Sequence, residues 1–173
     1  MAKNKGLQAA GFQLPFILLA EDDDNDAFGM ELAFHKAGLG ERVRRVCDGD
    51  EAIDYLSGKS KYSDRDEFPF PSLLLLDLKM THKDGFAVLD WARSHPRWRN
   101  IVIVVLTNSD DEDDIKRAYR MGANSYLVKP SDFLSFTDML QSLKHYWRLN
   151  QIPQMAENSK RHSSHSMGQA VRG

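Results

Sequence analysis

Cysteine is nearly absent from this sequence. The single residue Cys47 has no partner within the chain, which excludes an internal disulfide and suits a reducing compartment. Long apolar runs are also missing, and the longest, such as 101–106, are far too short to span a bilayer. The formal net charge is only −2, which gives no reason to expect nucleic acid as a partner. We therefore expect a soluble, cytoplasmic protein with neither a membrane nor a nucleic-acid partner.

The chain has enough apolar residues for one globular domain. Its 173 residues are 42% hydrophobic and 28% charged, a composition typical of a domain with a sizeable core. Residues 1–14 are expected to form a flexible N-terminus, 15–151 the folded domain, and 152–173, which lack apolar periodicity, a disordered polar tail. The stretch 58–72 is polar and interrupted by proline, as surface loops are.

Five short runs are predicted to be β-strands. Four of them are apolar or β-branched almost throughout, as strands buried on both faces of a parallel sheet must be: 16–20, 73–77, 101–107 and 125–129. The fifth run, 42–46, carries three arginines and is predicted to be an edge strand.

Stretches with helical spacing follow the strands, at 26–37, 50–56, 84–94, 111–121 and 132–151. The first places Phe28, Leu32 and Phe34 or His35 near one face. The last repeats apolar residues along one stripe: Phe133, Phe136, Leu140, Leu143 and Trp147. Because strand and helix alternate five times, we expect a doubly wound α/β fold with helices on both faces of the sheet.

Polar residues stand at the carboxyl ends of four predicted strands, where an open α/β sheet binds its ligands. Glu21 and Asp22 follow the first run and Asp77 ends the third. Thr107 ends the fourth and Lys129 the fifth. Carboxylates with neighbouring water are typical Mg²⁺ ligands, and a lysine and a hydroxyl can hold phosphate oxygens. The sequence therefore predicts a Mg²⁺ and phosphate site at this edge.

The segments "LLAEDD", "LLLLDLKMTHKDG", "VVLTNSD" and "YLVKP" resemble, in this order, the signatures of the response-regulator receiver domain. The resemblance runs from about residue 16 to 151 and implies a five-stranded parallel sheet in the order 2-1-3-4-5, the flavodoxin-like receiver fold. "PFPSLLLLDL", "KDGF", "YWRLNQIP" and the Glu-Asp pair further resemble the single-domain regulators that partner phytochrome-type histidine kinases.

This resemblance implies roles for the residues at the strand ends. Asp77 would accept the phosphoryl group, and Glu21 and Asp22 would hold Mg²⁺ together with Asp77 and the backbone carbonyl of Lys79. The other acidic residues of the segment 21–26 are expected at the start of the first helix, as caps and partners of the helix dipole.

Further roles follow for residues of the last two strands. Thr107 and Lys129 would bind the phosphoryl oxygens, and Tyr126 occupies the aromatic switch position. The resemblance also implies a cis bond between Lys129 and Pro130.

The expected function is that of a two-component response regulator, which receives its phosphoryl group from a sensor histidine kinase and is otherwise not an enzyme. Asn108 and Ser109 would flank the approach of water to the phosphoryl group and make its hydrolysis slow. A homodimer is expected through the fourth helix, fifth strand and fifth helix, because Tyr146 and Ile152 lie off the apolar stripe of the last helix.

Two alternatives belong to other classes of protein. One is a Mg²⁺-dependent phosphatase with an aspartyl nucleophile, since residues 22–24 contain an Asp-x-Asp spacing, although no segment is long enough for the cap that such enzymes need. The other is a pseudo-receiver that only binds proteins, which a missing acceptor or lysine would favour. A DNA-binding regulator would need a helix-turn-helix domain, which the polar residues after 150 cannot form.

Overall fold

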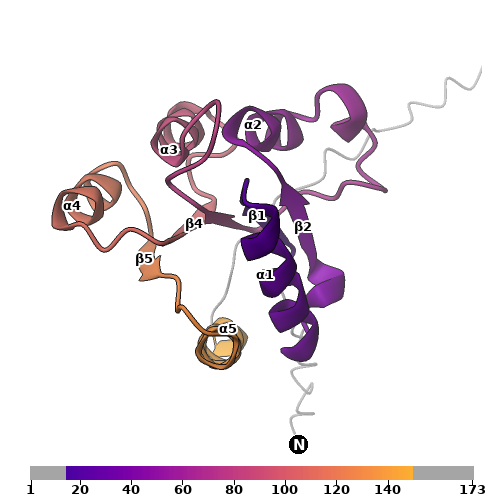
Figure 1. Ribbon diagram of the computed structural model, residues 1–173. Helices are drawn as coiled ribbons and strands as arrows, with labels where there is room; N and C mark the ends of the chain where they lie inside the picture. The colour runs from indigo at the N-terminus through magenta and orange to yellow at the C-terminus, as the bar shows by residue number, and fades with distance from the viewer. Residues whose placement is uncertain (1–14, 150–173) are drawn as a thin grey trace, which may run out of the picture.

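The computed structural model describes residues 15–149, which form one parallel sheet with helices on both faces (Figure 1). The strands are β1 (Ile17–Ala20), β2 (Val43–Val46), β3 (Leu73–Leu76), β4 (Val102–Thr107) and β5 (Ser125–Val128). All pairs are parallel, and the order in the sheet is β2-β1-β3-β4-β5. The predicted fold class, strand order and edge position of β2 are confirmed.

Five helices form the two outer layers. The helices α1 (Asp24–Lys36) and α5 (Phe133–Leu149) lie side by side on one face of the sheet. The other face is covered by α2 (Gly49–Ser57), α3 (Gly85–Ser94) and α4 (Glu112–Arg120). Two short 3-10 helices, η1 (Gly40–Arg42) and η2 (Ser60–Ser63), lie in the connections. No helix in the described range 15–149 is long and apolar enough to cross a membrane.

The central strands explain the continuous apolar runs of the sequence. Every residue of β1 and β3 is buried, with alternate side chains on opposite faces. Leu18 and Leu74 belong to the core under α2 and α3, whereas Leu19 and Leu75 belong to the core under α1 and α5. The expectation fails for β5, which is the second edge strand and leaves Val128 45% exposed.

The predicted inner face of α1 is wrong for two of its residues, whereas Phe34 is buried as predicted. Phe28 and Leu32 point outward and are 72% and 52% exposed. The helix instead buries a stripe with several small residues: Ala27, Met30, Ala33 and Phe34. Two alanines on this stripe allow α1 to lie close to the sheet and to α5, so packing decided which of two apolar faces is turned inward.

The apolar stripe of α5 is confirmed in its central part. Phe136, Leu140 and Trp147 are buried, and Leu143 packs on the same core. Phe133, at the first turn, is 36% exposed. The expectations for 1–14, 152–173 and Ile152 lie outside the described residues.

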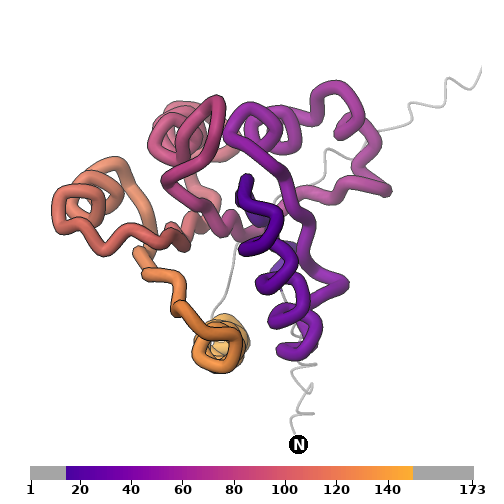
Figure 2. Tube along the Cα trace, in the orientation of Figure 1, coloured from indigo at the N-terminus to yellow at the C-terminus, as the bar shows by residue number. Residues whose placement is uncertain are grey.

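The stretch 58–72 is an ordered connection that runs out beyond α2 before the chain returns to β3 (Figure 2). Arg65 anchors it, because its guanidinium donates to the carbonyls of Tyr55, Leu56 and Phe68 at 2.8, 3.2 and 3.2 Å. The rings of Tyr55, Tyr62 and Phe68 pack against one another with centroids 4.8–6.1 Å apart. Much of the segment is exposed, as predicted for a surface loop, but Arg65 and the packed aromatic rings hold it in an ordered conformation.

Candidate functional site

The polar residues at the strand ends meet as the sequence predicts. Because parallel strands share one carboxyl edge, Glu21 after β1, Asp77 after β3 and Lys129 after β5 converge on one point. The Nζ of Lys129 lies 2.6 Å from Glu21 Oε2 and 2.7 Å from Asp77 Oδ2. These side chains are almost fully buried, at 4%, 1% and 6% exposure. Buried charges persist only when paired, and here each is paired.

The pKa values at this cluster follow from burial and pairing. Burial raises the pKa of Glu21, and the hydrogen bond from Lys129 offsets this only in part. Burial alone would lower the pKa of Lys129, but hydrogen bonds to Asp77 and Glu21 outweigh it and raise that pKa above its usual range. Pairing with Asp77 and Glu21 therefore favours the charged form of Lys129.

Backbone contacts hold Asp77 in place. Its N–H donates to Ala20 O at 3.0 Å, which continues the pairing of β3 with β1. Its Oδ1 accepts from the N–H of Lys79 at 3.1 Å. Behind it, Gly85 N donates to Leu78 O at 3.0 Å, and a Cβ at Gly85 would collide with the carbonyl oxygen of Asp77. A glycine is needed at position 85 so that α3 can begin this close to the backbone of Asp77.

The acidic residues after Glu21 separate into different environments. Asp22 lies at the surface of the cluster, where its Oδ2 accepts from the N–H of Thr81 at 2.7 Å. Asp23 caps α1 and Asp24 pairs with Arg45 at 2.7 Å, which confirms their expected place at the helix start. The carboxylate of Asp23 thus contacts the start of α1, and that of Asp24 contacts Arg45 of β2.

The donor set suits a hard divalent cation in chemistry. Glu21, Asp22 and Asp77 supply carboxylate oxygens at one edge of the sheet, which is the ligand type that Mg²⁺ takes. Within residues 15–149, however, no group of three or more His, Cys, Asp or Glu side chains is arranged to hold a metal ion. The physical reason is that the ammonium of Lys129 lies between the carboxylates of Glu21 and Asp77. A metal would need these side chains to turn.

The segment after β4 lines the other side of the cluster. Thr107 is fully buried, and its Oγ1 accepts weakly from Ser109 N at 3.5 Å. The Oγ of Ser109 donates to Asp114 Oδ2 at 2.7 Å, in the first turn of α4. Tyr126 is half-buried, and its hydroxyl donates to the carbonyl of Ser109 at 2.9 Å. The aromatic side chain of β5 is therefore attached directly to the loop that carries Thr107.

The predicted cis bond before Pro130 is wrong, since no peptide bond in the described part of the chain is cis. The trans form is intrinsically favoured by about 0.5–1 kcal/mol at an X–Pro bond. Lys129 reaches all its carboxylate partners with this bond in the trans form.

Asp26 is the site residue that the sequence did not reveal. Its Oδ2 lies 3.0 Å from Lys129 Nζ and accepts from Asn108 Nδ2 at 3.2 Å. It precedes Met30 and Ala33 by four and seven residues and so shares the inner face of α1. This spacing could have revealed Asp26 in the sequence, but the face with Phe28 and Leu32 was predicted to point inward. Asp26, Asn108 and Lys129 also line a hollow of about 370 Å³ between α1 and the loop after β5.

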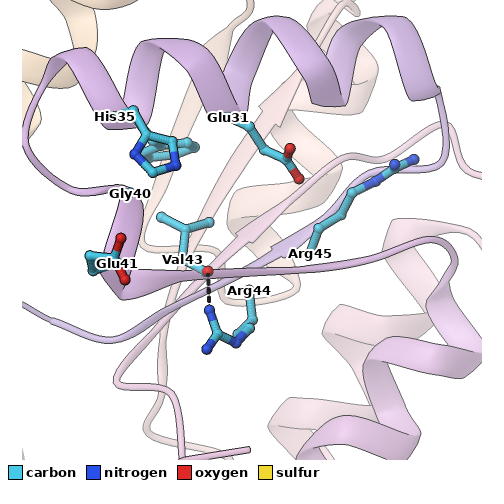
Figure 3. Close-up of a pocket in the computed structure, with 8 residues that line it drawn as sticks. Glu31, His35, Gly40, Glu41, Val43, Arg44 and Arg45 are labelled. Atoms are coloured by element: carbon cyan, nitrogen blue, oxygen red, sulfur yellow. Dashed lines mark hydrogen bonds between the residues drawn. The ribbon is translucent and has the colours of Figure 1, made fainter.

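A second hollow, of about 220 Å³, lies away from Asp77, between the second half of α1 and the edge strand β2 (Figure 3). Its lining mixes both signs of charge, with Glu31 and His35 from α1 and Arg44 and Arg45 from β2. Arg44 donates to the neighbouring Val43 carbonyl at 3.3 Å. None of the site residues predicted from the sequence lines this hollow.

Comparison with known proteins identifies the same segments. A family model for the response regulator receiver domain matches residues 17–141. The probable methanogenesis regulatory protein FilR2 of Methanothrix harundinacea is 37% identical over 139 residues, covering 77% of this chain and 84% of FilR2. Response regulator Rcp1 of Synechocystis is 31% identical over 131 residues, covering 76% of this chain and 87% of Rcp1.

Solved structures agree with these relatives. Response regulator RPA3017, in red light signaling of R. palustris, superposes with a TM-score of 0.76 at 34% identity, covering 82% of this chain and 99% of RPA3017. The phosphorylated cyanobacterial phytochrome response regulator RcpA superposes with a TM-score of 0.72 at 31% identity, covering 80% of this chain and 97% of RcpA. A Mn²⁺-bound form of Rcp1 superposes with a TM-score of 0.71 at 30% identity, covering 82% of this chain and 100% of Rcp1. Of these three neighbours, one is a phytochrome response regulator, one acts in red light signaling, and one was solved with bound Mn²⁺.

Proposed function

Because the chain belongs to the response regulator receiver family, we propose that it is a phosphorylation-dependent switch whose phosphoryl acceptor is Asp77. The observation that carries this proposal is the 2.7 Å contact between Asp77 Oδ2 and Lys129 Nζ, both buried at the carboxyl edge of the sheet. A buried carboxylate next to a cation is suited to receive a group that adds about −1.5 to −2 charge.

The proposed transfer starts from a phosphohistidine on a sensor kinase. An oxygen of the Asp77 carboxylate attacks phosphorus, and an O–P bond forms while the N–P bond breaks. The electron pair of that bond returns to the imidazole of the kinase, and Asp77 becomes an acyl phosphate. In this chain Lys129 would hold one phosphoryl oxygen and Thr107, whose hydroxyl lies at the end of β4, another.

Mg²⁺ is the cation we propose for this site, held by Glu21, Asp22, Asp77 and the backbone carbonyl of Lys79. When bound, the ion would neutralise charge on the phosphoryl oxygens during transfer. The support is the donor chemistry of these residues together with a family relative that binds Mn²⁺.

The proposed switch runs through Thr107 and Tyr126. When Thr107 turns toward the phosphoryl group, it leaves space that the ring of Tyr126 can enter. The hydrogen bond from Tyr126 to the Ser109 carbonyl already ties this ring to the loop after β4. Movement of that loop would therefore change the surface formed by α4, β5 and α5.

Asn108 and Ser109 are proposed to control how long the phosphoryl group survives. Hydrolysis needs a water molecule in line with the O–P bond, and Asn108 is exposed beside that approach. Ser109 is buried and held by Asp114, which keeps the loop close to Asp77. A long-lived phosphorylated form is expected.

A phytochrome-type histidine kinase is the proposed partner, because several similar solved structures are phytochrome or bacteriophytochrome response regulators. We place the receiver domain at 15–151 and its output in a protein contact, a homodimer through α4, β5 and α5. Exposed apolar side chains on this face support the dimer: Tyr119, Val128, Leu134, Tyr146 and Leu149.

Intact mass spectrometry after incubation with acetyl phosphate tests the acceptor. The wild type should gain the mass of one phosphoryl group only when Mg²⁺ is present, and Asp77→Asn should gain none, because an amide cannot carry the acyl phosphate. Asp90→Asn, an exposed exchange of the same kind on α3, is the matched control and should label normally. Labelling of Asp77→Asn at the wild-type level would disprove the assignment.

A further inference from the structure

All three hydrogen-bond donors of the Lys129 ammonium are in use. A lysine has three N–H donors and no acceptor. In this structure they point at Glu21 at 2.6 Å, Asp77 at 2.7 Å and Asp26 at 3.0 Å. Phosphorylation of Asp77 passes that contact to a phosphoryl oxygen, and the phosphoryl group can gain a second donor of Lys129 only if Glu21 or Asp26 gives up its contact.

Asp26 is the partner that can be released at least cost. Glu21 is 1% exposed, and separating it from its cation would leave a buried unpaired charge. The contact to Asp77 is the one that passes to the phosphoryl group, so it does not compete with that group. The side chain of Asp26 is 38% exposed, so water can replace the lysine there. Its contact to Lys129 is also the longest of the three.

The same carboxylate oxygen of Asp26 holds Asn108, the residue directly after Thr107. Asp26 therefore joins the first turn of α1 to both β4 and β5, the two strands that carry the proposed phosphoryl-binding residues. Releasing Asp26 would free a donor of Lys129 and the amide of Asn108 in one movement, and both lie beside Asp77.

We propose that Asp26 is a positioning residue that restrains the unphosphorylated state, by competing with the phosphoryl group for Lys129 and Asn108. This inference rests on the proposed function, since it assumes that the group arrives on Asp77. It predicts that a neutral residue at position 26 makes a phosphoryl mimic bind more tightly, although a potential partner of Lys129 has been lost.

Beryllofluoride, which imitates a phosphoryl group on a carboxylate, is the probe, titrated at saturating Mg²⁺. Asp26→Asn and Asp26→Ser should lower its dissociation constant by about two- to fivefold, the range expected for one partly exposed ion pair. Asp24→Asn removes the same charge from the same turn of α1, but the carboxylate of Asp24 faces Arg45. The affinity of this variant for beryllofluoride should therefore match that of the wild type. Asp26→Glu, which keeps the carboxylate, should restore most of the wild-type affinity.

A second readout uses the protein without metal or mimic. The side-chain amide signals of Asn108 in an NMR spectrum should shift in Asp26→Ser and stay in place in Asp24→Asn, because only Asp26 accepts from that amide. The melting temperatures of the variants test for a purely structural role of Asp26. In that case substitution would lower stability without tightening the binding of the mimic.

The possible results separate the two levels of the argument. If no variant and no wild type binds beryllofluoride, the proposed function fails. If the wild type binds it and both neutral variants at position 26 bind no more tightly than Asp24→Asn, the restraint is disproved.

Discussion

At the scale of single residues, neighbouring carboxylates in one short acidic segment have separate tasks. Glu21 is buried against a lysine, whereas Asp22 sits at the rim and accepts a backbone N–H. Asp23 caps α1, and Asp24 pairs with an arginine at the surface. Asp26 turns back into the site. The environments of these carboxylates differ because successive side chains point in different directions where the backbone leaves β1 and enters α1.

This division predicts unequal effects on metal binding. Asp22→Ala should weaken Mg²⁺ binding by about tenfold or more, because a carboxylate at the edge of the site is lost. Asp24→Ala should have little effect, since Asp24 is 89% exposed and paired with Arg45. Titration of Mg²⁺ followed by tryptophan fluorescence measures both constants. Equal losses would mean that the acidic segment attracts the ion only through its total charge.

Thr107 should be necessary for full switching but not for phosphorylation. Moving a population from 1:99 to 99:1 takes about 5.5 kcal/mol, and one hydrogen bond to a charged group supplies roughly 1.5–3 kcal/mol. Thr107→Ala should therefore accept the phosphoryl group on Asp77 and show only part of the spectral change by NMR. Thr107→Ser, which keeps the hydroxyl, should behave like the wild type. A complete change in the alanine variant would contradict the coupling.

At the scale of elements, Glu51 fastens α2 to the connection that follows it. Partial burial raises the pKa of Glu51, but hydrogen bonds from Lys61 and Tyr62, at 2.7 Å each, and from Cys47 N at 2.6 Å outweigh this and lower it to about 2. The usual value is 4.5. A carboxyl with a depressed pKa in the folded state stabilises the fold above its unfolded pKa and loses that effect as pH falls through the folded pKa.

Glu51→Gln should therefore lower the free energy of unfolding by about 1–2 kcal/mol at pH 7, after allowance for solvent screening. The difference from the wild type should shrink below about pH 4.5 and vanish near pH 2, as urea denaturation at several pH values would show. Asp50→Asn, an exposed exchange on the same turn, is the control. A deficit for Glu51→Gln that stays constant down to pH 2 would mean that the lost stability is not electrostatic.

At the scale of the whole molecule, exposed apolar side chains gather on two separate faces. Phe28 and Leu32 lie on the outer side of α1. Tyr119, Val128 and Tyr146 lie on α4, β5 and α5, which flank the β5 edge of the sheet in Figure 1. The second face includes the edge strand β5, whose outer edge pairs with no other strand within residues 15–149, so this face combines exposed apolar side chains with unpaired strand backbone.

We expect self-association through this second face. Tyr146 is 60% exposed, and Tyr146→Ala should shift the protein toward the monomer in sedimentation velocity, with and without acetyl phosphate. Phe28→Ala removes an even more exposed ring, at 72%, from α1 and should leave the dimer unchanged. If the wild type and both variants all sediment as monomers, the surface contacts a different protein.

Most of the architecture could be read from the sequence. The four apolar runs end one after another in Glu21, Asp77, Thr107 and Lys129, and strands of a parallel sheet must place such ends along one edge. The arginines of β2 marked an edge strand, and its place in the sheet confirms it. These features depend on local pattern and on the geometry of parallel strands, so the sequence alone determined them.

Tertiary structure decided what depends on neighbours far along the chain. α1 has apolar residues on two faces, and only packing on the sheet and α5 chose the one that includes Ala27 and Ala33. The same choice turned Asp26 toward Lys129, 103 residues away. The order of the 58–72 connection, held by Arg65, was settled in the same way. Each of these choices balances alternatives that differ by only a few kcal/mol, and long-range contacts, which no sequence window contains, provide that difference.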